Sequence, residues 1–353
     1  MRVTLGIPNP HNKVCKLKKS LYGLKQASRQ WFQKLAGFLN SRNYQQSKND
    51  PSLFLKKSAS NTTILAIYVD DILLTGSNST EIDSIKRHLD DEFTIKDLGI
   101  LHYFLGMEAS YINEGIVLTQ HKFTKDLLQL QHFSHKPATT PLPLHCKLTN
   151  EDPHDFSDPT LYRTLVGKLN FLTHTRPDLA FATQLLSQFM QTPKQSHFDA
   201  LLHVLQYVNI TAGQGILLKG EANLTLQAFS DSDWASCPIS RRSVTGYLIL
   251  LENSPTSWKS KKQSTISKSS SEAEYRAMQQ ATSEITWLVN LLEELNVTSL
   301  KPVTLYCNNQ SAMQIAKNPV YHERTKHIEI DCHFTREKLM EGLNLFTYSK
   351  SIG

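Results

Sequence analysis

Two adjacent aspartates, Asp70 and Asp71, interrupt an apolar, partly β-branched run that extends from Ile64 to Thr75. Apolar runs of about four to eight residues on both sides of a short polar step are typical of two strands joined by a tight hairpin. Because an unpaired buried carboxylate is costly, we expect the two aspartates to lie at the end of a sheet, facing solvent, a basic group or a metal ion. The stretch therefore predicts a fold that contains a β-sheet with an acidic hairpin tip.

The residues alone leave two interpretations of Asp70 and Asp71 open. Aspartate is common in turns, so the pair can be a turn and nothing more. Alternatively, the two carboxylates form a platform for Mg²⁺, a hard cation that prefers oxygen ligands and shares its coordination shell with substrate phosphates. Two such ions can stabilise the attacking and the leaving oxygen of a phosphoryl transfer.

Length and composition place the chain among globular proteins. Its 353 residues are enough for two or three domains, and its 40% hydrophobic and 20% charged residues exclude a disordered chain. The net charge of +6 weakly favours a polyanionic partner such as nucleic acid.

The sequence carries no recognisable targeting, membrane or zinc-binding signal. The N-terminus contains no apolar core of signal-peptide length, and no run approaches the roughly 20 apolar residues of a membrane span. The five cysteines include no CxxC pair, and the cluster of His322, His327, Cys332 and His333 matches no zinc signature. We therefore expect an intracellular protein, cytoplasmic or nuclear and not secreted, without disulfides or a membrane segment.

A basic segment near the N-terminus is interleaved with aromatic residues, a composition that suits a nucleic-acid surface. Its candidate nucleic-acid-binding lysines are Lys16, Lys18, Lys19 and Lys25. An ordinary solvated face, with the aromatic side chains in the core, is the alternative. Trp31, Phe32 and Leu35 recur at helical spacing after Ser28, which we expect to be the N-cap of a helix.

The middle of the chain alternates between helical and extended patterns. Its spacing predicts, in order, a helix over residues 79–93, a strand over 101–107, a helix over 119–130, a proline-rich linker over 137–159 and three helices within 161–207. Asp178, directly after Pro177, is expected to begin one of these helices by accepting backbone N–H groups.

The last third predicts three strands, a long helix, a strand, a short helix, another helix and a final strand. The first of these strands ends in acidic residues that include Asp231. The long helix begins near residue 271 and carries an apolar stripe with one polar member, Glu274, at its N-terminal end.

Several motifs resemble those of copia-type LTR retrotransposons. Tyr68-Val69-Asp70-Asp71 is similar to the YVDD hairpin of reverse transcriptases, and residues 14–27 and 103–108 resemble the VCKLKKSLYGLKQA and YFLGIE segments of the copia type. Further along, residues 229–235, 258–263 and 269–277 resemble the YSDADWA, WKSKKQ and SSSEAEYRA stretches of copia RNase H. The chain is thereby identified as a member of this family, covering the C-terminal part of reverse transcriptase and RNase H.

The resemblance implies an α/β (α+β) fold in three parts. Residues 1–115 would be a reverse-transcriptase palm fragment with the YVDD hairpin, residues 116–215 a mostly helical thumb or connection region, and residues 216–353 an RNase H-like mixed sheet with helices. The family acts on RNA–DNA hybrids by two-metal phosphoryl transfer. Mg²⁺ or Mn²⁺ is therefore the expected cofactor and a hybrid or other nucleic acid the expected partner, whereas the oligomeric state stays open.

The resemblance also assigns site residues. The catalytic and metal-binding residues that it implies are Asp70, Asp71, Asp231 and Glu274. Glu272 is less suitable than Glu274 as the second nuclease carboxylate, because it lies two residues before the apolar stripe. The WKSKKQ stretch adds three candidate nucleic-acid-binding residues, Lys259, Lys261 and Lys262.

The chain departs from the family pattern at one residue and at both ends. Asn308 stands where the third nuclease carboxylate is expected, and its neutral oxygen should weaken metal binding. The fourth acid of the family would follow Gly353, with Asp331 or Glu329 as candidates to replace it, and the first polymerase aspartate would precede the chain. We therefore expect a truncated copy, inactive as a polymerase and impaired as a nuclease; a non-catalytic nucleic-acid-binding module and a remnant without function are the alternatives.

Overall fold

The computed structural model describes residues 14, 24–58, 61–130, 138–143, 146–220, 224–317 and 329–349, with the side chains of 329–332 excepted. The chain divides into two compact units, one of Met1–Gly99 with Glu294–Asn296 and one of Ile100–Glu293 with Val297–Gly353. Three lysines of the basic segment, Lys16, Lys18 and Lys19, lie outside the described residues, as do His322 and His327.

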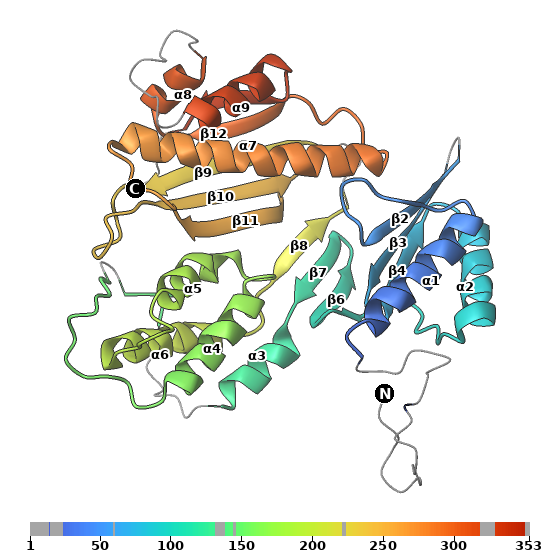
Figure 1. The fold of residues 1–353 in the computed structure, drawn as a ribbon, viewed down its shortest axis with the longest axis horizontal. Coiled ribbons are helices and arrows are strands. Elements are labelled where there is room, and N and C mark those ends of the chain that lie inside the picture. The colour runs from blue at the N-terminus through green and yellow to red at the C-terminus, as the bar shows by residue number, and fades with distance from the viewer. Residues whose placement is uncertain are drawn as a thin grey trace, which may run out of the picture. The chain divides into compact units, whose positions relative to one another are not determined.

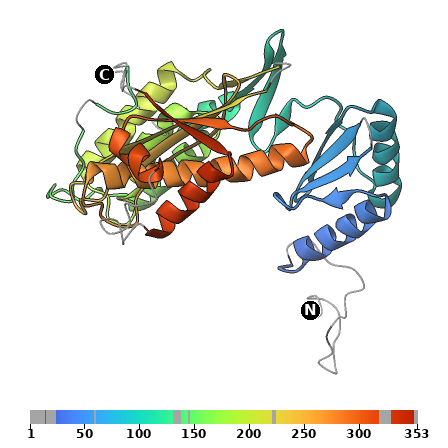
Figure 2. The same cartoon turned by 90° about the horizontal axis from the view of Figure 1, so that it is seen from above.

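The first unit is a four-stranded antiparallel sheet with two helices on one face, as Figures 1 and 2 show. Its strands lie in the order β1 (Gln45–Gln46), β2 (Leu53–Lys57), β3 (Thr62–Tyr68) and β4 (Asp71–Gly76), and its helices are α1 (Ala27–Ser41) and α2 (Ser79–Phe93). The core joins Leu35 and Leu39 of α1, Ile85 and Leu89 of α2, and Leu65 of the sheet. The helix predicted over residues 79–93 is confirmed.

The predicted N-cap of the first helix is wrong. Helix α1 begins at Ala27 after Gln26, and no side chain caps it, so Ser28 lies inside the first turn. The N–H of Ala27 already donates to the carbonyl of Leu24 at 2.9 Å, and a turn therefore precedes Ser28. In α2, by contrast, the Asn78 side chain accepts a hydrogen bond from the N–H of Glu81.

The second unit contains a small antiparallel sheet in the order β5-β6-β7-β8. Its strands are β5 (Tyr103–Phe104), β6 (Met107–Ile112), β7 (Gly115–Thr119) and β8 (Ile216–Lys219). The single strand expected over residues 101–107 is wrong in its extent, because Leu105 and Gly106 have positive φ angles and turn the chain back. A Cβ on Gly106 would lie 2.6 Å from the ring of Phe171, so this turn also depends on glycine for space.

A helical layer follows in the sequence. It contains α3 (His121–Leu128), α4 (Pro159–Leu172), the 3₁₀ turn η1 (Pro177–Leu179), α5 (Ala180–Ser187) and α6 (Gln195–Ile210). Fully buried side chains such as Leu165, Leu169, Leu201 and Leu205 form its core. The helices expected over 119–130 and within 161–207 are confirmed, and α5 packs against strand β11 of the larger sheet described next.

The larger sheet has five strands in the order β11-β10-β9-β12-β13 (Figure 1). They are β9 (Leu226–Asp233), β10 (Val244–Leu251), β11 (Ser254–Lys262), β12 (Val303–Cys307) and β13 (Asn344–Tyr348), joined by helices α7 (Ser270–Glu294), α8 (Gln310–Lys317) and α9 (Glu329–Met340). Strands β9 to β11 are antiparallel, whereas β12 runs parallel to both β9 and β13. Met278 and Ile285 of α7 pack on Ala228 and Leu305 of the sheet. The order of elements expected for the last third is confirmed.

Candidate active site

Strand β9 presents three side chains on one face through the alternation of a β-strand. Leu226, Ala228, Ser230 and Ser232 are buried, whereas the residues between them, Phe229, Asp231 and Asp233, are exposed. The sequence places Asp231 near the end of β9, where the strand leaves the core.

Glu274, in the first turns of α7, lies beside Asp231. Its side chain is buried, with the residue only 6% exposed, and its carboxylate accepts a hydrogen bond from the N–H of Ser232. Its Oε2 is buried and has no hydrogen-bond partner. Burial and the charge of Asp231 raise the pKa of Glu274 to about 8, with a further contribution from Asp233. Two predicted nuclease carboxylates, Asp231 and Glu274, are thus brought together.

Asn308 lies next to Asp231 because of the sheet register. Cys307, the last residue of β12, pairs with Ser230 of the parallel strand β9, so the following residues of both strands are neighbours. The Nδ2 of Asn308 donates a hydrogen bond to Oδ1 of Asp231 at 2.9 Å. A carboxylate can only accept, so the amide must turn its NH₂ group toward Asp231. The position at which the sequence resemblance expects a third carboxylate is therefore part of the cluster, with an amide in place of the acid.

Asp233 is a member of this cluster that sequence reasoning did not assign. Although Asp233 is exposed as a residue, partial burial of its carboxyl group and the charge of Asp231 raise the pKa of that group. The signal was present, because two residues that are two apart on a strand share a face. The candidates for a fourth acid, Glu329 and Asp331, have no described side chains.

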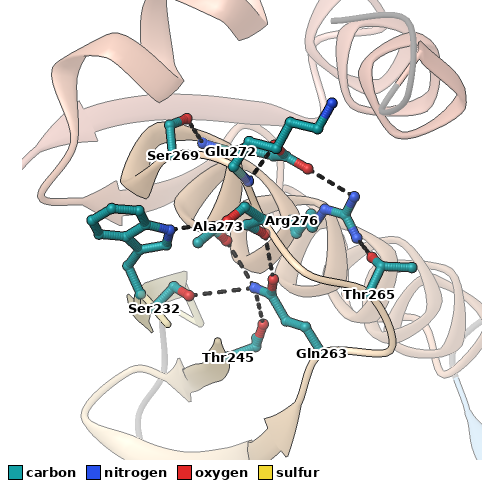
Figure 3. Close-up of polar contacts among 11 residues, drawn as sticks. Ser232, Thr245, Gln263, Thr265, Ser269, Glu272, Ala273 and Arg276 are labelled. Atoms are coloured by element: carbon teal, nitrogen blue, oxygen red, sulfur yellow. Dashed lines mark hydrogen bonds and ion pairs between the residues drawn. The ribbon is translucent and has the colours of Figure 1, made fainter. Parts of the chain in front are cut away.

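Glu272 has other partners. Its Oε1 accepts a hydrogen bond from Arg276 at 2.9 Å and its Oε2 accepts one from the N–H of Lys268, also at 2.9 Å (Figure 3). Its carboxylate therefore stabilises the loop before α7 and the first turns of this helix.

An open groove of about 820 Å³ runs beside the carboxylates. Asp231, Asp233 and Asn308 line it together with Phe229, which stacks on Tyr306 with ring centroids 4.9 Å apart. Other lining residues come from the sheet and the helical layer, among them Pro177, Phe181, Leu248, Trp258 and Lys259. The groove is thus acidic at the carboxylate cluster and aromatic along its floor.

The three lysines of β11 do not share one face. Lys259 and Lys261 are exposed, and strand alternation puts them on the same side as Ser257, whose hydroxyl donates to Glu284 of α7. Lys262 is on the opposite side, where its Nζ donates to Oε1 of Gln188 at 2.6 Å. Lys25, before α1, is exposed.

Asp178 does not begin a helix in the way expected from the sequence. Its carboxylate accepts two hydrogen bonds from Arg176, at 3.0 and 2.7 Å, and one from the hydroxyl of Tyr207 at 3.0 Å. Arg176 is only 2% exposed and donates as well to the carbonyl and hydroxyl of Thr211. Burial raises the pKa of Asp178, but the Arg176 guanidinium outweighs burial and holds it below its usual range. The network ties η1, at the edge of the groove, to the end of α6.

In the first unit, Asp70 and Asp71 lie at the tip of the β3–β4 hairpin, as the apolar pattern predicts. Tyr68 pairs with Asp71, and Val69 and Asp70 form the turn. Both aspartates are exposed. Val69 has a φ of 51°, a strained value for a β-branched residue, and its carbonyl accepts a hydrogen bond from the indole of Trp31 at 2.9 Å.

The nuclease cluster has the donor set for a divalent cation, although one ligand is neutral. Within the described part of the chain, no group of three or more His, Cys, Asp or Glu side chains is arranged to hold a metal ion. The orphaned Oε2 of Glu274, the carboxylate of Asp231 and the carbonyl oxygen of Asn308 nevertheless offer hard oxygen ligands. A cation would relieve the repulsion that raises the pKa of Glu274. These residues therefore fit one divalent ion.

A membrane span is not found among the helices that the structure describes, because none is both long enough and apolar enough.

Comparisons with known proteins identify relatives of this chain. Residues 3–143 match the family model for reverse transcriptase (RNA-dependent DNA polymerase). The retrovirus-related Pol polyprotein from transposon RE1 of Arabidopsis thaliana is 42% identical over 332 residues, which is 94% of this chain and 23% of that polyprotein. The chain thus spans about a quarter of the length of this relative.

Two further comparisons, one of sequence and one of structure, also find similar proteins. An uncharacterized mitochondrial protein of Arabidopsis thaliana is 41% identical over 224 residues, which is 63% of this chain and 93% of that protein. The solved structure of the foamy viral protease-reverse transcriptase dRH in complex with double-stranded DNA has a TM-score of 0.53 at 13% identity, and covers 93% of this chain and 50% of the viral one. The viral structure supports the fold alone. The chain belongs to the family of retrovirus-related Pol polyproteins of copia-type transposons, and its residues 3–143 correspond to the reverse transcriptase of that family.

Proposed function

We propose that the second unit is an RNase H-type nuclease that cleaves the RNA strand of RNA–DNA hybrids with divalent metal ions, and that Asn308 impairs it. One observation carries the proposal: Asp231, the partnerless Oε2 of Glu274 and the side chain of Asn308 meet where β9, α7 and β12 end or begin. Such a convergence of oxygen ligands at the edge of a groove is the arrangement that phosphoryl-transfer sites require.

Each residue of the cluster has a chemical role in this proposal. Asp231 and Glu274 hold the cation, which when bound polarises the scissile phosphate and lowers the pKa of a water molecule. Asn308 contributes one neutral oxygen, and its NH₂ group occupies Oδ1 of Asp231. The site therefore has one negative charge fewer than the family pattern and one carboxylate oxygen engaged by an amide, both of which weaken cation binding.

The groove supports a nucleic-acid substrate. Phe229 is 37% exposed, and its ring can contact the sugar or base of a strand. Lys262 is the lysine of β11 on the same face of the sheet as Asp233, since both residues pair with Val244, whereas Lys259 and Lys261 lie on the face of α7. Bound metal would also reduce the repulsion between a phosphate backbone and Asp231.

Asp70 and Asp71 are the candidate metal ligands of the first unit, where they lie exposed at the tip of the β3–β4 hairpin. A non-catalytic nucleic-acid-binding role is the second candidate function, and the observation that favours it is the replacement of a charged ligand by Asn308.

The test is a comparison of labelled substrates with the whole chain in Mg²⁺. We expect slow cleavage of an RNA–DNA hybrid, much less cleavage of double-stranded RNA or DNA, and complete loss in Asp231→Asn. If hybrid binding is salt-dependent but neither wild type nor Asn308→Asp cleaves, the binding-module function replaces the nuclease.

A further inference from the structure

The side chain of Gln263 joins strands β9 and β10 to helix α7, and β9 and α7 carry Asp231 and Glu274. Gln263 follows β11 and is only 3% exposed, although its amide is strongly polar. We infer that Gln263 is a positioning residue, which holds the start of α7, and with it Glu274, against Asp231 on β9. This inference rests on the proposed metal site.

The amide nitrogen of Gln263 has three acceptors. It donates to Oγ of Ser232 at 3.3 Å, to Oγ1 of Thr245 at 3.1 Å and to the carbonyl of Ala273 at 3.0 Å (Figure 3). Ser232 lies directly after Asp231, and Ala273 lies directly before Glu274. One side chain therefore connects the backbone neighbours of both candidate metal ligands.

The orientation of the Gln263 amide is fixed by its partners. A backbone carbonyl accepts hydrogen bonds only, so the NH₂ end must face Ala273. At the other end, Oε1 accepts a hydrogen bond from the hydroxyl of Ser267 at 2.9 Å. The carbonyl of Ser267 in turn accepts one from the indole of Trp234, which follows the acidic end of β9. Both ends of the amide are satisfied, so the network has one arrangement.

A separate set of contacts holds the loop before α7 to the helix itself. The hydroxyl of Ser269 accepts from the N–H of Glu272, whose carboxylate accepts from Lys268 and Arg276 (Figure 3). Arg276 also contacts Thr265. These contacts shape the turn, but they do not reach β9. Of the two sets, the Gln263 amide is the one that ties the helix start to the strand of Asp231.

The loss of Gln263 should change the position of Glu274 relative to Asp231, because few contacts hold the buried Glu274 carboxylate to β9. Its Oε2 has no partner, and its described link to β9 is the hydrogen bond from the N–H of Ser232. If Gln263 is lost, the start of α7 can shift relative to β9, and the distance between the two carboxylates is no longer fixed. Residues that orient metal ligands typically change metal affinity by about 10- to 100-fold when they are replaced.

Gln263→Met tests this inference, because methionine has nearly the same length but no donor. Thr245→Val is the matched control: it alters the same buried network, on the neighbouring strand β10, without removing the bond between Gln263 and Ala273. We would measure hydrogen exchange by mass spectrometry and Mn²⁺ binding by calorimetry on the whole chain, and kcat and KM for a labelled hybrid.

We expect Gln263→Met to speed exchange at the start of α7, to weaken Mn²⁺ binding by about tenfold or more and to lower kcat more than it changes KM. Thr245→Val should leave Mn²⁺ affinity within about twofold of wild type, even when it lowers the melting temperature as much as Gln263→Met. Unchanged exchange in α7 in Gln263→Met, or equal loss of Mn²⁺ affinity in both variants, would overturn the inference.

The same measurements separate this inference from the proposed function. A wild-type chain that binds Mn²⁺ and loses affinity in Gln263→Met, but cleaves no hybrid, supports the positioning role and removes the nuclease. A chain that cleaves hybrid, with Gln263→Met unaltered in exchange and Mn²⁺ affinity, keeps the nuclease and removes the positioning role. A wild-type chain that binds no Mn²⁺ overturns both.

Discussion

Replacing Asn308 by aspartate should destabilise the metal-free second unit and make its stability depend on Mg²⁺. The change removes the 2.9 Å hydrogen bond from Asn308 to Asp231, which is worth about 1 kcal/mol. It also brings a carboxylate against Asp231 in a solvent-exposed position, where two like charges about 4 Å apart repel by about 1 kcal/mol. A total loss of about 2 kcal/mol corresponds to a fall of about 4–8 °C in the melting temperature of a unit of this size.

The assay is calorimetric melting of the whole chain, in EDTA and in millimolar Mg²⁺. Asn309→Asp is the matched control, because the side chain of Asn309 accepts from the N–H of Ala312 at 2.9 Å, a bond that aspartate retains. Mg²⁺ should restore most of the loss in Asn308→Asp, since binding to the folded state stabilises it, and should act little on Asn309→Asp. An EDTA melt of Asn308→Asp at or above wild type, or no recovery in Mg²⁺, would refute the reasoning.

Three further predictions follow from the described contacts. The pKa of Glu274 is about 8 in the folded chain and about 4.3 in the unfolded chain. Its contribution to the free energy of unfolding is therefore full below about pH 4 and is lost as the pH rises toward 8. Metal-free melts should show this loss of stability in wild type and not in Glu274→Gln. Arg176→Met should lower the free energy of unfolding in urea by about 2 kcal/mol by leaving Asp178 unpaired, and Arg176→Lys should recover less than half of it because lysine cannot form the paired bonds. Val69→Gly should raise the urea stability of the first unit by about 1 kcal/mol by relieving the positive φ; a lower stability would show that the turn is not strained.

The helices and the strands of the larger sheet could be predicted from the sequence because they show hydrophobic periodicity, whereas strands β1, β2, β7 and β8 were not predicted. The apolar stripe that begins at Glu274 predicted α7. The apolar runs around Asp70 and Asp71 predicted β3, β4 and the hairpin between them. Such patterns report which side chains are buried, and burial decides the type of element.

Local features were missed where a tertiary contact decides the outcome. The turn at Gly106 faces the ring of Phe171, which is distant in the sequence. Ser28 does not cap the first helix, because a hydrogen-bonded turn already begins at Leu24. Strand alternation divides the lysines of β11 between the two faces of the sheet, with Lys259 and Lys261 on one face and Lys262 on the other. The sequence motif alone does not show this division.

Two acids of the candidate site, Asp231 and Glu274, were assigned from the sequence, whereas Asp233 and the supporting residue Gln263 were not. Asp231 and Glu274 could be assigned from the resemblance, and the sheet register brings Asn308 to them as that resemblance implies. The role of Gln263 could not be inferred, because its partners Ser232 and Ala273 come from a strand and a helix whose packing is known only from the fold.

In the nuclease site proposed for the second unit, Asn308 replaces a charged metal ligand. The rate at which wild type and Asn308→Asp cleave a labelled RNA–DNA hybrid should therefore be measured as Mg²⁺ is titrated. We expect Asn308→Asp to cleave about tenfold faster or more and to reach its half-maximal rate at a lower Mg²⁺ concentration, and we expect an added Asp231→Asn to abolish both gains. Identical Mg²⁺ dependence in wild type and Asn308→Asp, or cleavage that survives Asp231→Asn, would contradict this proposal.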